Sequence, residues 1–307
     1  MKKLATFLTL SLALLLPLTA GDLAQRISHT DPSKYAHHAD VHAGAGPLDY
    51  MQLFDFHALE TNLYFLHRGV IEPKGGIGAH FHNQCEEMFV ILDGEAQFTI
   101  DGRTSLVKGP AGAPCRMGHS HAIYNPTDKP VQWMNINVSA MKGVYDAFNL
   151  DDARKDAQLD KTPTFMTMHL DRALLSQVTA MHGGKGTVAY RRALGTSVFL
   201  GPWAYVDHLM IPPGASVGAH MHHLTAEVFY VMTGDGKATV SSLGTPADTA
   251  DIHTGDAIPI RLSEVHSFEN NGNAPLELMI IGVTTDNSKQ VDVVDGAALP
   301  GGRGRGN

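Results

Sequence analysis

The chain has 307 residues, of which 43% are hydrophobic, and its formal net charge is −8 at neutral pH. That length suffices for one large or two medium-sized domains, each with its own core. The acidic balance argues against nucleic acid or an anionic membrane surface as the main partner.

The N-terminal segment, residues 1–20, has the pattern of an export signal. Lys2 and Lys3 form a positive start, a leucine-rich run without charge extends to Leu18, and Ala20 is a small residue suited to the position before a cut. The alternative is an uncleaved membrane anchor, but the run is short for spanning a bilayer. We therefore expect a signal peptide over residues 1–20 and a mature protein in the periplasm or outside the cell, with no membrane partner.

Three further segments lie outside any strand-like pattern. Residues 21–49 form a polar, histidine-rich arm containing His29, His37, His38 and His42, to which we assign no site. Residues 151–183 are rich in Ala, Leu, Gln and Lys, so we expect a short helical bridge there. The Gly- and Arg-rich tail, residues 296–307, is expected to be disordered.

Two stretches of short apolar or alternating runs fill the rest of the chain, with Gly, Pro, Asn and Asp between the runs. This composition is typical of antiparallel β domains. We therefore predict an all-β fold with an N-terminal domain over residues 50–150 and a C-terminal domain over residues 184–295.

Candidate metal ligands occur near the start of the first domain. His80 and His82 are one residue apart, so an extended strand projects both from one face. Glu86 and Glu87 follow, and an Asp-Gly turn then closes a hairpin at Gly94. Neutral imidazoles and a carboxylate are suitable ligands for a divalent first-row metal. For one His-x-His pair alone, the alternative of ordinary strand histidines would be preferred.

The same pattern recurs without a gap in the second half of the chain. The alignment of the two copies selects Glu87 over Glu86, because its counterpart Glu227 has no acidic residue before it. A second block follows each copy at a slightly larger offset, with His121 and His266 each four positions before an asparagine. Such a repeat indicates internal duplication. The first-block identities are Pro73, Gly78, Ala79, His80, His82, Glu87, Phe89 and Gly94 with Pro213, Gly218, Ala219, His220, His222, Glu227, Phe229 and Gly234.

Each half resembles a cupin, and the two together resemble bicupins of the quercetin dioxygenase and oxalate decarboxylase type. The resemblance implies two tandem jelly-roll β-barrels and up to two metal ions per chain. Three imidazoles and one carboxylate would accept Fe, Mn, Ni, Cu or Zn and leave open positions for substrate. The implied ligands are His80, His82, Glu87 and His121 for one ion and His220, His222, Glu227 and His266 for the other.

Arg116 and Arg261 depart from the family pattern, which often has proline at these positions. We hypothesise that one or both bind a substrate carboxylate or other anion at the barrel mouth, since guanidinium forms bidentate pairs with carboxylates. The alternative is a structural salt bridge, for example between Arg261 and Glu264. His119 lies two residues before His121, so an extended strand projects both from one face, and His119 is a candidate proton donor. Its alternative is an accessory hydrogen-bonding role.

Several functions are compatible with this family. We favour an exported, metal-dependent, dioxygenase-like oxidoreductase acting on a small carboxylate, enediol, flavonol or sugar acid. One alternative is a sugar or sugar-acid isomerase or lyase, and another is a non-catalytic metal- or carbohydrate-binding protein. The sequence leaves a homo-oligomer open. It also leaves open whether Cys85 and Cys115 form a disulfide or stay buried free thiols.

Overall fold

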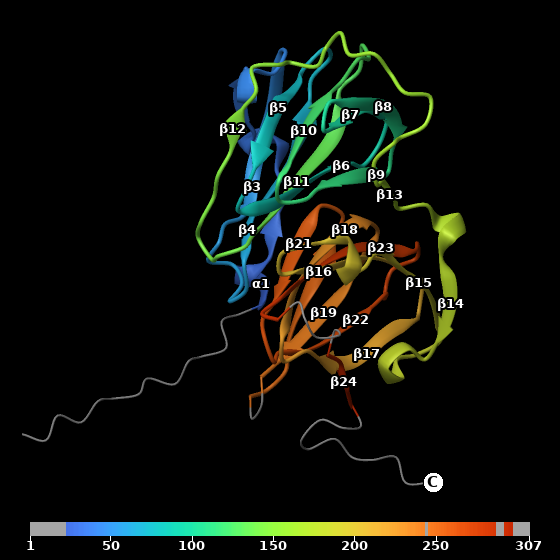
Figure 1. Ribbon diagram of the computed structural model, residues 1–307. Helices are drawn as coiled ribbons and strands as arrows, with labels where there is room; N and C mark the ends of the chain where they lie inside the picture. The colour runs from blue at the N-terminus through green and yellow to red at the C-terminus, as the bar shows by residue number, and fades with distance from the viewer. Residues whose placement is uncertain (1–22, 243–244, 287–291, 297–307) are drawn as a thin grey trace, which may run out of the picture.

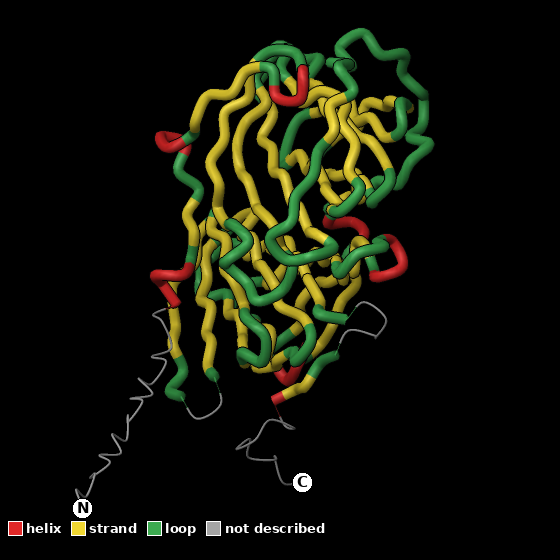
Figure 2. The backbone as a smooth tube through the Cα atoms, turned by 60° about the vertical axis from the view of Figure 1, so that its left-hand side comes forward, coloured by secondary structure: helices red, strands yellow, loops and turns green. Residues whose placement is uncertain are grey.

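A computed structural model describes residues 23–242, 245–286 and 292–296. Two β-barrels stand one above the other, and strands make up most of the chain (Figures 1 and 2). The predicted all-β fold with two tandem jelly rolls is therefore confirmed. The expected signal peptide and nearly all of the tail lie outside the described residues. Within the described residues, no helix has the length and apolar character needed to cross a membrane.

The N-terminal barrel consists of a seven-stranded and a five-stranded antiparallel sheet. In spatial order, the larger sheet contains β13 (Met168–His169), β9 (Ala111–Cys115), β6 (Cys85–Ile91), β11 (Val131–Ser139), β4 (Leu63–Ile71), β3 (Pro47–Phe54) and β2 (Ala36–Ala39). The smaller sheet contains β12 (Phe148–Asn149), β5 (Gly76–His82), β10 (His119–Tyr124), β7 (Glu95–Ile100) and β8 (Arg103–Lys108).

The C-terminal barrel repeats this plan. Its larger sheet contains β1 (Ser28–His29), β21 (Asp256–Ile260), β18 (Thr225–Thr233), β23 (Leu276–Thr284), β16 (Trp203–Ile211), β15 (Thr187–Leu194) and β14 (Ser176–Thr179). Its smaller sheet contains β20 (Asp248–His253), β19 (Asp235–Ser241), β22 (Val265–Glu269), β17 (Ser216–Met221) and β24 (Val294–Asp295). Helical residues of the described chain are confined to α1 (Leu23–Arg26) and the 3-10 helices η1 (Pro32–Lys34), η2 (Val41–Ala43), η3 (Arg172–Leu174), η4 (Met181–Gly183) and η5 (Thr196–Val198).

The bridge over residues 151–183 has less helix than its composition suggests. Its helical content is limited to the 3-10 helices η3 and η4, and these are accompanied by the short strands β13 and β14 and by irregular backbone. Its backbone bonds to the barrels, since Asp160 N–H donates to Thr104 O at 2.7 Å and Leu170 N–H donates to Pro110 O at 3.0 Å. These tertiary hydrogen bonds replace the ladder of a helix and override the local helix propensity.

The two barrels pack through the outer faces of their larger sheets. Along β6, Phe89 points into its barrel while Met88 and Val90 point to the opposite face, as the two-residue period of a strand requires. β18 shows the same alternation, with Phe229 inside and Val228 outside. The outward-facing side chains of both barrels form one shared buried cluster, so the central strands are apolar on both faces.

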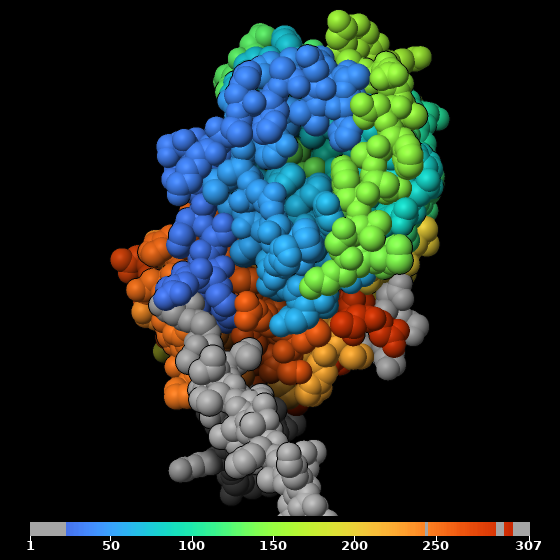
Figure 3. All heavy atoms as spheres, turned by 90° about the vertical axis from the view of Figure 1, so that its left-hand side faces the viewer, coloured from blue at the N-terminus to red at the C-terminus, as the bar shows by residue number. Residues whose placement is uncertain are grey.

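Each half of the chain also contributes an edge strand to the other barrel. β1, near the start of the described chain, pairs with β21 of the C-terminal barrel, with Ser28 opposite Ala257. β13, from the bridge, pairs with β9 of the N-terminal barrel, with Met168 opposite Gly112. Figure 3 shows the blue N-terminal residues reaching down onto the orange C-terminal barrel. The two barrels are thus linked by reciprocal exchange of their leading segments.

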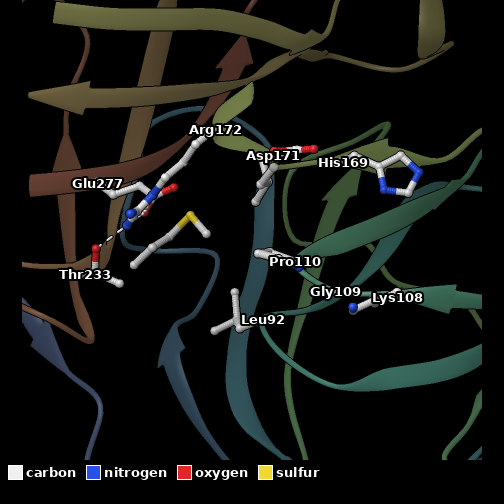
Figure 4. Close-up of a pocket in the computed structure, with 11 residues that line it drawn as sticks. Leu92, Lys108, Gly109, Pro110, His169, Asp171, Arg172, Thr233 and Glu277 are labelled. Atoms are coloured by element: carbon white, nitrogen blue, oxygen red, sulfur yellow. Dashed lines mark hydrogen bonds and ion pairs between the residues drawn. The ribbon is translucent and has the colours of Figure 1, made fainter. Parts of the chain in front are cut away.

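Hydrogen bonds to the buried Glu277 fix η3 to the C-terminal barrel. Glu277 is 4% exposed, and its Oε1 accepts a hydrogen bond from His208 Nε2 at 2.7 Å. Its Oε2 accepts from Arg172 Nε at 3.0 Å and Nη2 at 2.6 Å. Arg172 and Glu277 line one wall of a cavity of about 670 Å³ between the barrels, opposite Lys108 and His169 (Figure 4). Burial alone would raise the pKa of Glu277, but the hydrogen bonds from His208 and Arg172 lower it to about 2.

We predict that Glu277→Gln lowers the free energy of unfolding at neutral pH by about 1–3 kcal/mol, because charge-assisted hydrogen bonds are lost in a buried place. The pKa is below the ordinary value in the folded state, so this stabilisation is present above about pH 4.5 and disappears as the pH falls toward about 2. Urea unfolding of both proteins across this pH range should show the difference shrinking. Asp128→Asn, whose side chain is 92% exposed, is the control. A difference independent of pH would contradict the assignment.

Candidate metal centres

Each barrel brings together the four residues predicted as its metal ligands. In the N-terminal barrel, β5 supplies two histidines, β6 the glutamate and β10 the third histidine. In the C-terminal barrel, β17 supplies the first histidine and His222 follows directly after this strand, while β18 supplies the glutamate and β22 the last histidine. Strand pairing places His121 directly opposite His80 and His266 directly opposite His220. All eight side chains are buried, and they form two clusters: His80, His82, Glu87 and His121, and His220, His222, Glu227 and His266.

The ligand atoms converge on one point in each cluster. His121 Nε2 lies 3.0 Å from His80 Nε2 and 3.2 Å from His82 Nε2, and the Glu87 carboxylate oxygens lie 3.6–4.0 Å from these nitrogens. In the C-terminal cluster, Glu227 Oε2 lies 3.0 Å from His266 Nε2. Ligands bound about 2.0–2.2 Å from one ion lie roughly 3 Å apart, so the spacing suits a shared metal ion.

Backbone carbonyls determine the tautomers of these histidines. His80 Nδ1 bonds to Gly78 O at 2.8 Å, and His82 Nδ1 bonds to Asp146 O at 2.5 Å. A carbonyl oxygen can only accept, so each Nδ1 carries the proton and each Nε2 presents a lone pair. His220 Nδ1 donates to Gly218 O at 3.0 Å, and His266 Nδ1 donates to Glu264 O at 3.1 Å. Both centres therefore present unprotonated nitrogens to the point of convergence.

The electrostatics of this arrangement fit a bound cation. Glu227 Oε2 and His266 Nε2 face each other as acceptors, and neither has a hydrogen-bond donor among the described residues. Burial lowers the pKa of His80 and of His220 to about 2, so these imidazoles stay neutral. Converging lone pairs with no proton between them repel unless a cation binds, and three nitrogens with one carboxylate suit a divalent transition metal.

A family model matches each barrel separately. It describes the cupin domain, and it matches residues 67–137 and 207–282. The chain belongs to the cupin family. Because both halves match, the protein is a bicupin with an N-terminal and a C-terminal cupin domain, each of which carries one ligand cluster.

Two relatives each match a stretch of this chain about as long as one cupin domain. An oxalate-binding protein of Thermotoga maritima is 28% identical over 121 residues, which are 39% of this chain and 96% of that protein. A mannose-1-phosphate guanylyltransferase of Escherichia coli is 22% identical over 120 residues, which are 39% of this chain and 24% of that protein.

Two solved structures cover most of the bicupin. Oxalate decarboxylase from Bacillus subtilis matches with a TM-score of 0.61 at 17% identity, covering 89% of this chain and 81% of that one, and that enzyme has Mn(II) centres. The formate complex of the Lactobacillus farciminis oxalate decarboxylase matches with a TM-score of 0.62 at 15% identity, covering 87% and 88%. At such identities the likeness shows the shared fold.

The two cupin domains hold their glutamates differently. In the N-terminal domain, Asn135 and Asn137 on β11 each donate an amide hydrogen bond of 2.7 Å to one oxygen of Glu87. In the C-terminal domain, the Tyr205 hydroxyl donates to Glu227 Oε1 at 2.6 Å. These partners orient the carboxylate for a bound ion, as groups that contact metal ligands commonly do.

Gly282 explains why a tyrosine fits in the second domain. Gly282 lies opposite Glu227 on β23, as Asn137 lies opposite Glu87 on β11. A Cβ at Gly282 would come within 2.4 Å of Tyr205 Cζ. The absence of a side chain on β23 therefore makes room for the tyrosine ring from β16.

Three of the four C-terminal ligands, His220, His222 and Glu227, line a cavity of about 320 Å³. One wall is polar and contains Arg192, Asp207, Tyr190 and Tyr205 next to the ligand Glu227. The rest of the lining consists of His182, the ligands His220 and His222, and six apolar residues. The apolar residues are Met181, Leu209, Val217, Phe229, Ile280 and Val293. Such a mixture of apolar wall and converging polar groups is typical of a small-molecule site.

The residues around the N-terminal centre include two stacked ring pairs. Phe89 stacks on His121 with ring centroids 4.2 Å apart, and Phe65 stacks on His67 at 4.1 Å. In the alignment of the two copies, Phe65 and His67 correspond to Tyr205 and Asp207. Burial lowers the pKa of His67 to about 4, so this ring is neutral near pH 7. The two domains thus place the same ligands in different surroundings.

Arg116 and His119 lie together, but in a different groove from the metal ligands. They line a groove of about 330 Å³ that also contains Asp101 and residues 164–166 of the bridge, and it includes none of the eight ligands. His119 Nδ1 bonds to Asp101 Oδ2 at 2.6 Å. The expected position beside the metal is therefore corrected, and a catalytic role for either residue stays a prediction.

Arg261 also lies outside the metal cavity. It lines a surface groove of about 410 Å³ with Arg26 and Asp55. Arg26, not Arg261, forms the ion pair with Glu264, at 2.9 Å, while the Arg261 backbone N–H donates to the same carboxylate at 2.9 Å. A substrate-binding role for Arg261 likewise stays a prediction.

Cys85 and Cys115 are free, buried thiols, so the alternative of a disulfide is not realised in this structure. Cys85 Sγ lies 3.2 Å from His82 Nδ1, close to the first metal centre. Burial raises the pKa of the Cys85 thiol to about 12, so it is protonated at neutral pH and is not a reactive thiolate.

We predict that His80→Ala and His220→Ala each lower the metal content of the purified protein by about one ion per chain, and that the double variant holds essentially none. Each change removes one of four converging ligands. Elemental analysis of the full chain measures this. His223→Ala is a matched control, because His223 is adjacent to a ligand but bonds to Ser263 Oγ at 3.1 Å. Unchanged metal content in both single variants would contradict the assignment.

Proposed function

We propose that the protein is a metal-dependent oxidoreductase whose C-terminal cupin domain converts a small carboxylate. One observation carries this proposal: the C-terminal ligands share their cavity with the guanidinium of Arg192. A divalent ion held by these residues would bind and polarise an oxygen of the substrate. The names of the oxalate-binding relative and of the oxalate decarboxylases support a small carboxylate as the substrate class.

Neighbouring side chains hold Arg192 in place. Its Nε and Nη2 donate to the two oxygens of Asp207 at 3.0 and 3.1 Å, and Tyr190 donates to the same carboxylate at 2.8 Å. The guanidinium also lies 4.2 Å from the centre of the Tyr205 ring. Burial would lower the pKa of Arg192, but hydrogen bonding to Asp207 raises it above its ordinary value. The Arg192 guanidinium therefore stays positively charged, and its neighbours hold it in one orientation.

The charges of the cavity favour an anionic substrate. Asp207 balances Arg192, while Glu227 balances only half of the charge of a divalent ion. The hydrogen bonds from Arg192 to Asp207 use Nε and Nη2 and leave Nη1 for another partner, and the side chain is 40% exposed. We infer that Arg192 Nη1 and the ion bind the carboxylate together, while Tyr205 keeps Glu227 oriented toward the ion.

We predict that Arg192→Gln raises KM for the carboxylate substrate at least about tenfold, with a smaller effect on kcat, because a charge-assisted hydrogen bond to the substrate is lost. Arg191→Gln is the matched control: the next residue on β15 points to the opposite face, where its Nη1 donates to His169 O. Equal KM values for Arg192→Gln and the wild type would contradict this role.

The reaction class is tested on metal-loaded protein with an oxygen electrode and a screen of small acids, sugars and flavonols. We expect substrate-dependent oxygen uptake that His220→Ala abolishes and His80→Ala retains. Equal turnover without oxygen would contradict an oxygen-dependent reaction and favour an isomerase or lyase. Activity lost in His80→Ala and kept in His220→Ala would move the site to the N-terminal domain.

We further propose that the protein is exported to the periplasm or beyond. The proposal rests on the charged start, apolar run and small residues of positions 1–20. We predict that the purified mature protein begins at Gly21, as determined by N-terminal sequencing, and is recovered from the periplasmic or extracellular fraction. An intact Met1 on cytoplasmic protein would contradict export.

A further inference from the structure

Two equivalent histidines outside the ligand sets contact the metal centres. His42 in η2 stacks on His80 with ring centroids 3.9 Å apart and planes inclined by 15°. His182 in η4 stacks on His220 at 3.9 Å and 14°. His42 and His182 are separated along the chain by the same interval as the histidines they contact. The arm, to which the sequence analysis assigned no site, and the end of the bridge therefore belong to the duplicated unit.

The backbone around these histidines is built to hold the stack. His42 and His182 both adopt left-handed conformations, with φ of 52° and 51°, which non-glycine residues seldom adopt. The loop presses directly on the ligand strand, because a Cβ at Gly78 would lie 2.1 Å from His42 O and one at Gly218 would lie 2.1 Å from His182 O. The glycine two residues before each ligand pair is thus needed for this contact.

A hydrogen bond from Nδ1 fixes the plane of each stacked ring. His42 Nδ1 lies 2.5 Å from Asn149 Oδ1, and His182 Nδ1 lies 2.5 Å from Asp295 Oδ1. Asn149 on β12 is directly opposite His80, and Asp295 on β24 is directly opposite His220. Different residues thus supply the same contact in both domains, and both stacked rings are held between a strained turn and an added edge strand.

We propose that His42 and His182 are positioning residues of the two metal centres. The Nδ1–H bond of His220 to Gly218 O fixes one ring atom but allows the ring plane to tilt. Stacking of His182 restricts that tilt and keeps Nε2 of His220 directed at the ion. Groups that orient metal ligands typically change metal affinity by about 10–100-fold. The ligand in question is the divalent cation itself, so this inference does not depend on the proposed substrate or reaction.

The test uses the full chain with the substitution His80→Ala, so that only the C-terminal centre binds metal. This protein is loaded with Co(II). In this background, His182→Ala should release Co(II) to a chelator about 10–100-fold faster and should change the visible d–d spectrum. His182→Phe keeps a stacked ring without the Nδ1 donor and should retain most of the original rate and spectrum. His223→Ala, the neighbouring non-ligand histidine, should change neither.

Several outcomes would overturn the proposal. One is His182→Ala with the original release rate and spectrum. Another is His182→Phe behaving as His182→Ala, which would assign the effect to the hydrogen bond with Asp295 instead of the stack. A lower melting temperature of the metal-free protein with an unchanged Co(II) spectrum would indicate a purely structural role. If His182→Ala does not fold, His42→Ala and His42→Phe in a His220→Ala background decide the question at the other centre.

Discussion

The convergence of unprotonated imidazole nitrogens and a carboxylate inside each barrel is the constraint on which the rest of the structure depends. Such a cluster is tolerable only where the proton positions are fixed, and backbone carbonyls fix them at Gly78 and Gly218. The glutamates need their own donors, which β11 supplies in one domain and Tyr205 in the other. The strands around each centre are therefore arranged for orientation as much as for packing.

Duplication preserved the ligands while their surroundings diverged. Gln52 and Arg192 occupy equivalent positions, as do His67 and Asp207. In the second domain the two charged side chains bond to each other and line a cavity, whereas the first domain surrounds its ligands with stacked rings. The same four ligands are therefore set in two different surroundings within one chain.

Local rules were sufficient to predict the two β domains and the candidate ligands, and the resemblance to cupins implied the barrels and the complete ligand sets. Strand alternation places His80 and His82 on one face, and the internal repeat selects Glu87. Arg192 and Tyr205 could not be found in this way, since their roles depend on strands paired across the sheet. Arg116 was misplaced because sequence distance to His121 says nothing about the turn between them, which directs it to another groove. Extending the same alignment to the arm would have revealed that His42 and His182 are equivalent, although their stacking on the ligands is visible only in the structure.

The exchanged leading segments have a consequence for how this architecture is assembled. Leu23 is fully buried against the C-terminal barrel, and β13 completes the edge of the N-terminal one. A single half of the chain would thus have an unpaired sheet edge and an arm without the surface it packs on. In a dimer of two identical halves, the arm of each subunit would pair with the sheet edge of the other. The bicupin has the geometry of an arm-exchanged dimer whose subunits have been joined into one polypeptide, so the partnership between its halves no longer depends on concentration.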